Sequence, residues 1–315
     1  MSLHIGVDVG GTKVLAGEVA PDGTILRTAT RRTPGRRVSV TAVEDALTDA
    51  VQAVAGDRTP DGIGLAAAGF VDAERERVMF APHLPWAGQP VRRRLAERWG
   101  VPVALDNDAN CAALAESELG AAHQVSSAVV ITMGTGIGGA LLLDGHLLRG
   151  SQGMAGEFGH MQVVPDGRAC ECGHCGCWEQ YSSGNALVRF ARDRVGVEPT
   201  VLTELCQGRP DQLTGPMVTA AAEDGDLVAR QAFASVGEWL GVGLAGLVAA
   251  FDPEVVVVGG GVSAAGDRLL DPARTALARA LVGGERRRVP PVRVARLGPE
   301  AGLVGAAILS RSANV

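Results

Sequence analysis

The residues best suited to chemistry are cysteines, four of which lie within eight residues at Cys170, Cys172, Cys175 and Cys177, ten positions after His160. The chain shows no export signal, so we interpret this density as thiolate metal ligands rather than as disulfides. Zn²⁺ takes four ligands at tetrahedral angles, and three cysteines with one histidine form a common closed, structural set. Cys170 and Cys172 share a C-x-C spacing, and a glycine-bearing turn must bring back either Cys175 or Cys177 as the third thiolate.

Two acidic residues flank this cluster. Glu157 lies three positions before His160, on the same face if that turn is helical, and Glu179 lies two positions after Cys177. A bound metal would hold both carboxylates in fixed positions, and the second ring nitrogen of His160 would keep a proton to donate to an alcohol oxygen. These groups suit the recognition of a polyol. The alternative is a structural zinc site remote from any chemistry.

Two glycine-rich turns follow predicted strands, at residues 8–13 (Asp-Val-Gly-Gly-Thr-Lys) and 134–139 (Gly-Thr-Gly-Ile-Gly-Gly). Glycines let the backbone approach a ligand and direct its N–H groups into one concavity, which suits phosphate oxygens. Neither turn is a Walker A motif, and a strand rather than a helix follows the second turn, which argues against a dinucleotide fingerprint. A third glycine run, residues 259–261, follows a predicted buried strand. Together the three runs favour nucleotide phosphates over ordinary hairpin turns. Lys13, the only lysine of the chain, lies in the first of them.

Asp106, Asn107 and Asp108 follow the predicted strand 101–105. Ligands of open α/β sheets bind beyond the carboxyl ends of strands, so a catalytic base is expected here. Phosphoryl transfer to an alcohol needs a positioned hydroxyl, a proton acceptor and positive charge on the phosphates. Asp108 could accept the proton, Asn107 could orient the alcohol, and Mg²⁺ near Asp8 could bridge phosphates. The alternative is that one aspartate only caps the following helix.

The elements that position these residues occur in two similar sets. Strand, glycine turn, strand, Asp-Gly hairpin and strand occupy residues 4–31 and again residues 128–149. This internal duplication predicts two related α/β domains that face each other across a cleft. Further strands are predicted at 62–67, 101–105, 254–258 and 291–295. Helices are predicted at 41–54, 89–99, 109–119, 185–194, 199–206, 215–223, 226–250, 267–281 and 302–312.

Composition limits the possible partners. The chain has 315 residues, a net charge of −6 and 3% aromatic residues, which argues against nucleic-acid binding. The longest apolar run, residues 239–251, is too short to span a bilayer, which argues against a membrane protein. The N-terminus shows no signal peptide, so we expect a cytoplasmic protein.

Four motifs together resemble the ROK family (repressors, open reading frames and kinases). They are Asp8-x-Gly-Gly-Thr-Lys13, the glycine turn at 134–139, Glu157-x-Gly-His160, and Cys170-x-Cys172-Gly-x-x-Gly-Cys177-x-Glu179. The resemblance covers essentially the full length and is nearest to the bacterial ATP-dependent glucokinases of the family. One departure is Ala140, where a further glycine is common after the second turn.

The resemblance implies a two-domain actin-like/hexokinase (ribonuclease H-like) α/β fold whose interdomain cleft closes around sugar and ATP. Residues 1–108 would form a small domain, with the C-terminal helix at about 301–315 packing back onto it, and residues 109–300 a large domain that contains the zinc motif. The implied reaction is phosphorylation of the glucose 6-hydroxyl by ATP, giving glucose 6-phosphate and ADP. ATP, Mg²⁺ and a structural Zn²⁺ are the implied cofactors, and a homodimer or homotetramer is the implied assembly.

The resemblance also assigns roles to individual residues. Asp108 becomes the general base. The sugar contacts become Gly69, Asn107, Asp108, Glu157, His160 and Glu179. The ATP contacts become Asp8, Gly10, Gly11, Thr12, Lys13, Thr135, Gly136, Gly184, Gly259 and Gly260. The zinc ligands become His160, Cys170, Cys172 and Cys177, with Cys175 on a variable position of the motif.

Three alternatives stand beside this prediction. A kinase for another hexose (mannose, N-acetylmannosamine or fructose) would share every motif. A sugar-sensing repressor of the family would need a helix-turn-helix domain ahead of the first strand, for which we expect no room in a chain that begins at Met1. A non-catalytic, zinc-stabilised binding protein would tolerate the loss of Asp108.

Overall fold

The computed structural model of the protein describes residues 2–35, 37–81 and 83–312. The chain divides into two compact units, each with its own set of internal contacts. Unit 1 comprises Met1–Ser126, Ala140–Gly156 and Arg296–Val315, and unit 2 comprises Ser127–Gly139 and Glu157–Ala295.

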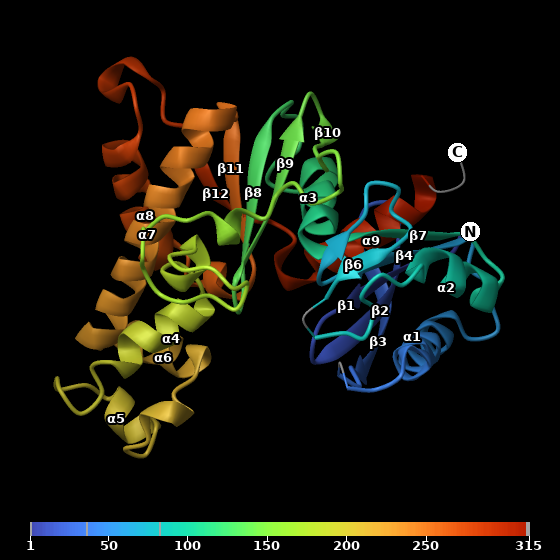
Figure 1. The fold of residues 1–315 in the computed structure, drawn as a ribbon, viewed down its shortest axis with the longest axis horizontal. Helices are drawn as coiled ribbons and strands as arrows, with labels where there is room; N and C mark the ends of the chain where they lie inside the picture. Colours follow the sequence, from blue (N-terminus) through green and yellow to red (C-terminus); the bar gives the residue numbers. More distant parts are fainter. Residues whose placement is uncertain (1, 36, 82, 313–315) are drawn as a thin grey trace. The chain divides into compact units, whose positions relative to one another are not determined.

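A five-stranded sheet forms the centre of unit 1 (Figure 1). Its strands are β1 (His4–Val9), β2 (Lys13–Val19), β3 (Ile25–Arg32), β4 (Gly62–Ala67) and β7 (Val103–Asn107), in the order β3-β2-β1-β4-β7. β1, β4 and β7 are parallel, with Val9 opposite Ala67 and Ala67 opposite Asn107. The carboxyl ends of these three strands therefore lie together at one edge of the sheet.

The two faces of this sheet are covered differently. Ile5, Val7 and Val9 alternate along β1 into the core formed with α1 (Val40–Ala55) and α2 (Val91–Trp99). On the opposite face, α9 (Ala301–Ser312) lies directly on Gly6 and Gly64, which are neighbours in β1 and β4. A Cβ atom on Gly6 would lie 2.0 Å from the Leu303 carbonyl oxygen, so only glycine permits this close packing. α3 (Asp108–Leu119) packs against α9 through small residues.

The second five-stranded sheet repeats the strand plan of the first. Its strands are β8 (Ala128–Met133), β9 (Ile137–Leu143), β10 (His146–Leu147), β11 (Val255–Gly259) and β12 (Val292–Val294), in the order β10-β9-β8-β11-β12. The meander at one side is antiparallel, and β8, β11 and β12 are parallel. The internal duplication predicted from the sequence is thus present in the backbone.

Helices form most of unit 2. They are α4 (Gly184–Arg192), α5 (Leu202–Leu205), α6 (Gly215–Glu223), α7 (Leu227–Phe251) and α8 (Asp267–Ala280). α7 runs beside α8 (Figure 1), and it also packs against α4 and α6. With 25 residues and a mean hydropathy of 1.5, α7 passes a length and composition test for a membrane span, although 61% of the tested window is buried inside the protein. The apolar run at 239–251 is therefore part of a longer core helix.

Short elements complete the described part of the chain. These are the hairpin β5 (Phe70–Val71) and β6 (Val78–Phe80), and the 3₁₀ turns η1 (Phe158–His160), η2 (Trp178–Gln180), η3 (Pro210–Gln212), η4 (Gly261–Ala265), η5 (Gly284–Arg286) and η6 (Gly298–Glu300).

The structure differs from the predicted boundaries at four places. β7 continues to Asn107, so Asp106 and Asn107 lie inside the strand rather than after it. The second glycine turn is shorter than predicted, because β9 begins at Ile137. The helix predicted at 199–206 covers only Leu202–Leu205. The last strand of the second repeat, predicted to reach residue 149, ends at Leu147 as β10.

Candidate active site and metal centre

Asp106 is buried at the end of β7, and both of its carboxylate oxygens are occupied. Oδ1 accepts the backbone N–H of Asn107 at 2.8 Å and the side-chain amide of Asn110 at 2.9 Å. Oδ2 accepts the Nε–H of the Arg149 guanidinium at 2.8 Å and forms an ion pair with Nη2 at 2.7 Å. A carboxylate offers about four acceptor positions. Asp106 is therefore engaged within the protein through both of its oxygens.

Asn107 caps the helix that follows. Its Oδ1 accepts the backbone N–H groups of Ala109 at 2.8 Å and Asn110 at 3.1 Å, while its Nδ2 donates to the Gly69 carbonyl oxygen at 3.0 Å. The cap of α3 is thus an asparagine and neither aspartate, which answers the alternative left open by the sequence. The same side chain ties the loop at Gly69 to this corner.

Asp108 is the first residue of α3 and is partly exposed, and its Oδ1 accepts the Ala109 N–H at 2.9 Å. Burial raises the pKa of Asp108 above its usual range. Burial, and next the negative charge of Asp108, raise the pKa of Asp8 to about 6, while Lys13 acts in the opposite direction. The carboxyl ends of β1 and β7 thus hold two carboxyl groups that repel each other, an arrangement that suits a proton acceptor beside a cation-binding group.

The first glycine turn lies between β1 and β2. The Gly10 N–H donates to the Lys13 carbonyl oxygen at 3.0 Å, and Thr33 fixes the turn through hydrogen bonds to the carbonyl oxygens of Gly10 and Thr12. The side chains of Thr12 and Lys13 are exposed. A hollow of about 550 Å³ beside the turn is lined by Gly11, Thr12, Arg32, Thr33, Pro34 and Gly35.

The second glycine turn is held by the first residues of α4. Gly184 and Asn185 donate backbone hydrogen bonds to the carbonyl oxygens of Gly134 and Thr135, at 2.8 and 3.3 Å. Gly259 lies opposite Thr132, the residue two positions before the turn. Gly260 has a φ of +83°, and a Cβ there would lie 2.5 Å from the Met133 carbonyl oxygen. The structure therefore gathers the residues proposed from sequence for ATP in unit 2: Thr135, Gly136, Gly184, Gly259 and Gly260.

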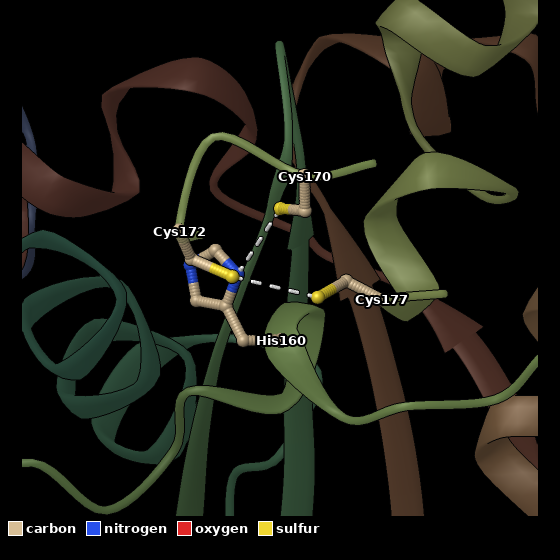
Figure 2. Close-up of side chains that lie close together, drawn as sticks. All are labelled: His160, Cys170, Cys172 and Cys177. Carbon is tan, nitrogen blue, oxygen red and sulfur yellow. Dashed lines mark hydrogen bonds between the residues drawn. The ribbon is translucent and has the colours of Figure 1, made fainter. Parts of the chain in front are cut away.

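A compact cluster of thiols and an imidazole lies in unit 2 (Figure 2). One ligand atom from each of His160, Cys170, Cys172 and Cys177 lies within 4.8 Å of the others. Cys170 Sγ is 3.8 Å from His160 Nδ1, and Cys172 Sγ is 3.5 Å from Cys177 Sγ. With Zn–S bonds of about 2.3 Å, the edge of a tetrahedral site is roughly 3.8 Å, so this donor set fits Zn²⁺.

Cys175 and Cys177 were alternatives for the third thiolate, and the structure separates them. Cys175 is exposed and lies outside the cluster, and its carbonyl oxygen accepts a hydrogen bond from the Gln162 side chain. Cys177 is buried within the cluster. The four predicted ligands are therefore the four residues that the structure brings together.

The flanking turns fix this cluster in unit 2. Trp178, which begins η2, is fully buried, and its indole N–H donates to the Trp239 carbonyl oxygen of α7 at 2.7 Å. Glu179 has one carboxylate oxygen 3.2 Å from Cys170 Sγ, and its other oxygen accepts the Ile137 N–H at 3.4 Å. Glu157 closes the η1 turn through its carbonyl oxygen, which accepts the His160 N–H at 3.1 Å, so the turn is helical as expected. Glu179 thus connects the thiol cluster to the second glycine turn.

Arg149 is the residue of this region that the sequence reasoning missed. It lies after β10, at the end of the predicted repeat 128–149, and belongs to none of the four motifs. Its importance depends on its long-range contact with Asp106.

Comparisons with known proteins agree with this geometry. The model of the ROK family matches residues 4–313. A glucokinase of Streptomyces coelicolor is 44% identical over 314 residues, which cover 99% of this chain and 98% of that protein. The crystal structure of a ROK family glucokinase from Streptomyces griseus in complex with glucose and AMPPNP matches with a TM-score of 0.91 at 44% identity, covering 99% of this chain and 100% of that one.

A ROK hexokinase from Thermus thermophilus matches with a TM-score of 0.74 at 38% identity, covering 98% of both chains. These similarities confirm the predicted α/β fold of the actin-like/hexokinase class. By its motifs, its fold and its full-length similarity, the chain belongs to the ROK family.

Proposed function

We infer that the protein is a kinase that transfers the terminal phosphoryl group of ATP to the 6-hydroxyl of glucose, giving glucose 6-phosphate and ADP. The full-length similarity to a Streptomyces griseus kinase bound to glucose and AMPPNP supports both substrates. The observation that carries the proposal is the corner between β7 and α3. There a saturated Asp106 and a capping Asn107 precede a partly exposed Asp108 of raised pKa.

Asp108 is proposed as the general base. In phosphoryl transfer the attacking hydroxyl loses its proton as the phosphorus–oxygen bond forms, and a carboxylate with a raised pKa accepts that proton more readily. The helix start at Asp108 fixes the position of the carboxylate relative to β7. The proposed glucose contacts are Gly69, Asn107, Asp108, Glu157, His160 and Glu179.

The two glycine turns are proposed to bind the phosphates of ATP. Their backbone N–H groups and the hydroxyls of Thr12 and Thr135 are donors suited to phosphate oxygens, and Lys13 adds a positive charge. Gly184, at the N-terminus of α4, is proposed as a contact near the adenine, while its own N–H holds the second turn by donating to the Gly134 carbonyl oxygen. The remaining proposed ATP contacts are Asp8, Gly10, Gly11, Gly136, Gly259 and Gly260.

Two metal ions are proposed. Asp8 would hold Mg²⁺, and a bound Mg²⁺ neutralises charge on the phosphates. The fit rests on the raised pKa of Asp8, because a nearby cation would offset the repulsion from Asp108. His160, Cys170, Cys172 and Cys177 would hold a structural Zn²⁺. Because Nδ1 of His160 faces the thiols, Nε2 is the nitrogen that would donate to a sugar oxygen.

The surroundings and assembly of the protein are further proposals. A cytoplasmic protein is proposed, and the net charge of −6 argues against a nucleic-acid partner. The family resemblance supports a homodimer or homotetramer, which light scattering of the purified protein would measure. It also supports a small domain at residues 1–108 and a large one at 109–300.

A coupled assay of the purified protein tests the proposed activity. With ATP and Mg²⁺, we expect one ADP and one glucose 6-phosphate per turnover, and a higher kcat/KM for glucose than for mannose, N-acetylmannosamine or fructose. A higher kcat/KM for one of the other hexoses would reassign the substrate. An absence of ADP release with every hexose would contradict a kinase and favour a sugar-binding protein.

A further inference from the structure

We propose that Arg149 is a positioning residue for phosphoryl transfer, which acts through Asp106 to hold the corner between β7 and α3 in its productive conformation. The proposal rests on the proposed function, because Asp108 in that corner is the proposed base. Both residues of the pair lie in unit 1.

The contact between the two side chains is highly directional. The guanidinium donates its Nε–H to Oδ2 of Asp106 and places Nη2 2.7 Å from the same oxygen. The Asp106 side chain is only 3% exposed, and that of Arg149 is 25% exposed. This leaves Oδ1 turned toward the corner, where it accepts the Asn107 and Asn110 N–H groups. The guanidinium therefore determines which oxygen of the Asp106 carboxylate faces the corner.

The orientation of Asp106 controls the next two residues. Its bond to the Asn107 backbone fixes the point at which the strand ends, and Asn107 then caps α3 and holds the Gly69 carbonyl. Asp108 follows directly. A displacement of about 1 Å in a reacting group can lower a rate by about 10²-fold, so small changes in this corner are expected to have large effects.

The loop that carries Arg149 also touches the segment after Gly69. The Arg149 carbonyl oxygen accepts the Ala155 N–H at 2.9 Å, which closes the loop. Within it, Gly153 lies so close to β5 that a Cβ would be 2.2 Å from the Val71 carbonyl oxygen. The loop thus supports the corner through Arg149 and the strand after Gly69 through Gly153.

A second ion pair of unit 1 provides a matched control. Arg94 donates to the buried Glu44 at 2.6 and 3.1 Å, but these residues lie on α2 and α1, and neither is adjacent in sequence to a proposed site residue. Loss of either arginine removes a hydrogen-bonded partner from a buried carboxylate, and Glu44 also lies 3.7 Å from Arg98. Only the loss of Arg149 would disturb the residues proposed for catalysis.

The test compares Arg149→Met, Arg149→Lys, Asp106→Asn and the double variant Asp106→Asn/Arg149→Met with Arg94→Met. For Arg149→Met we expect kcat to fall about 10²-fold, with the KM for ATP unchanged. Arg149→Lys should recover part of the loss, and the double variant should be no worse than Arg149→Met alone, since Arg149 acts through Asp106. Arg94→Met should lower the Tm and leave kcat within about twofold.

Three results would overturn the proposal. The first is a kcat for Arg149→Met and Arg149→Lys that equals that of Arg94→Met at a temperature well below each Tm. The second is a raised KM for ATP at unchanged kcat, which would make Arg149 a nucleotide ligand. The third is a double variant much slower than Arg149→Met. If Arg149→Met fails to fold, Arg149→Lys and Asp106→Asn carry the same comparison. An inactive wild type would instead contradict the proposed function.

Discussion

The two five-stranded sheets share one strand plan but differ in the side chains at the ends of their parallel strands. In the first sheet, β1 carries Asp8 one residue before its end, and β7 ends in Asp106 and Asn107. In the second sheet, the position of Asp8 is taken by Thr132, and β12 ends in Val294. The backbone plan supplies equivalent positions, and the side chains placed there decide which chemistry each copy can perform.

The two sheets are called here the first and the second copy of the strand plan, and their electrostatics differ accordingly. Burial raises the pKa values of Asp8 and Asp108 in the first copy, and the negative charge of Asp108 raises the pKa of Asp8 further. The second copy presents glycine backbone at Gly134, Gly136 and Gly260, and at Gly260 the Met133 backbone lies close enough to exclude a side chain. We therefore expect proton transfer and cation binding to depend on the first copy, while the second copy contributes uncharged backbone N–H groups to phosphate binding.

Replacement of Asp8 by asparagine should have the largest effect on this comparison. We expect Asp8→Asn to lower kcat by about 10²- to 10³-fold, because the proposed magnesium ligand is lost. The matched variant Thr132→Ala, at the equivalent position of the second sheet, should change kcat by less than about threefold. Equal losses in the two variants would contradict a division of chemistry between the copies.

Asp8→Asn, which should lower kcat, should at the same time raise the stability of the protein. The pKa of Asp8 is about 6 in the folded protein and 3.8 as its ordinary value. Between these values the folded state retains a proton that the unfolded state has lost, so this group lowers stability as the pH rises from about 4 to 6. Asp8→Asn should therefore stabilise the metal-free protein at pH 7 by about 1–3 kcal/mol. Urea unfolding at pH 4 and pH 7 measures this, and a destabilised variant at pH 7 would contradict the raised pKa.

The thiol cluster has no counterpart in the first copy, and Cys172→Ser tests its role. We expect loss of bound zinc and a rise of about tenfold in the KM for glucose, because metal binding contributes folding energy to the loop that carries His160 and Glu179. Cys175→Ser, which alters an exposed cysteine outside the cluster, should retain one zinc per chain by elemental analysis. An unchanged glucose KM in a zinc-free Cys172→Ser protein would show that the metal site is remote from the sugar.

Gly260 and Gly261, which follow β11, allow a test of phosphate binding by the second copy. The expected change in the KM for ATP is smaller than the changes predicted above. Gly260→Ala places a Cβ 2.5 Å from a backbone atom at a φ of +83°, so we expect a loss of about 1–3 kcal/mol in stability and a KM for ATP raised a few-fold. Gly261→Ala meets nothing within 4 Å and should change neither quantity. Similar behaviour of the two variants, by thermal unfolding and ATP titration, would argue against phosphate binding at this turn.

Local sequence patterns predicted much of this architecture, because apolar alternation and glycine turns depend on near neighbours. The repeat, the parallel strand β11 and the helices α1, α3 and α7 were predicted nearly as observed. The four zinc ligands could be named because their spacing is short and their chemistry is unusual.

The remaining features depend on contacts between distant parts of the chain. Arg149 meets Asp106 across 43 positions, and no local pattern marks such a pair. The capping role of Asn107 was missed because the strand was predicted to end two residues too early.

The most direct measurement of the central claim is made on Asp108→Asn. Calorimetry should show glucose affinity within about threefold of wild type, while single-turnover transfer from ATP should slow by about 10²- to 10⁴-fold, the usual range for a lost general base. Transfer at the wild-type rate with normal glucose affinity would contradict the assignment of Asp108 as the base. It would also contradict the expectation that proton transfer depends on the first sheet.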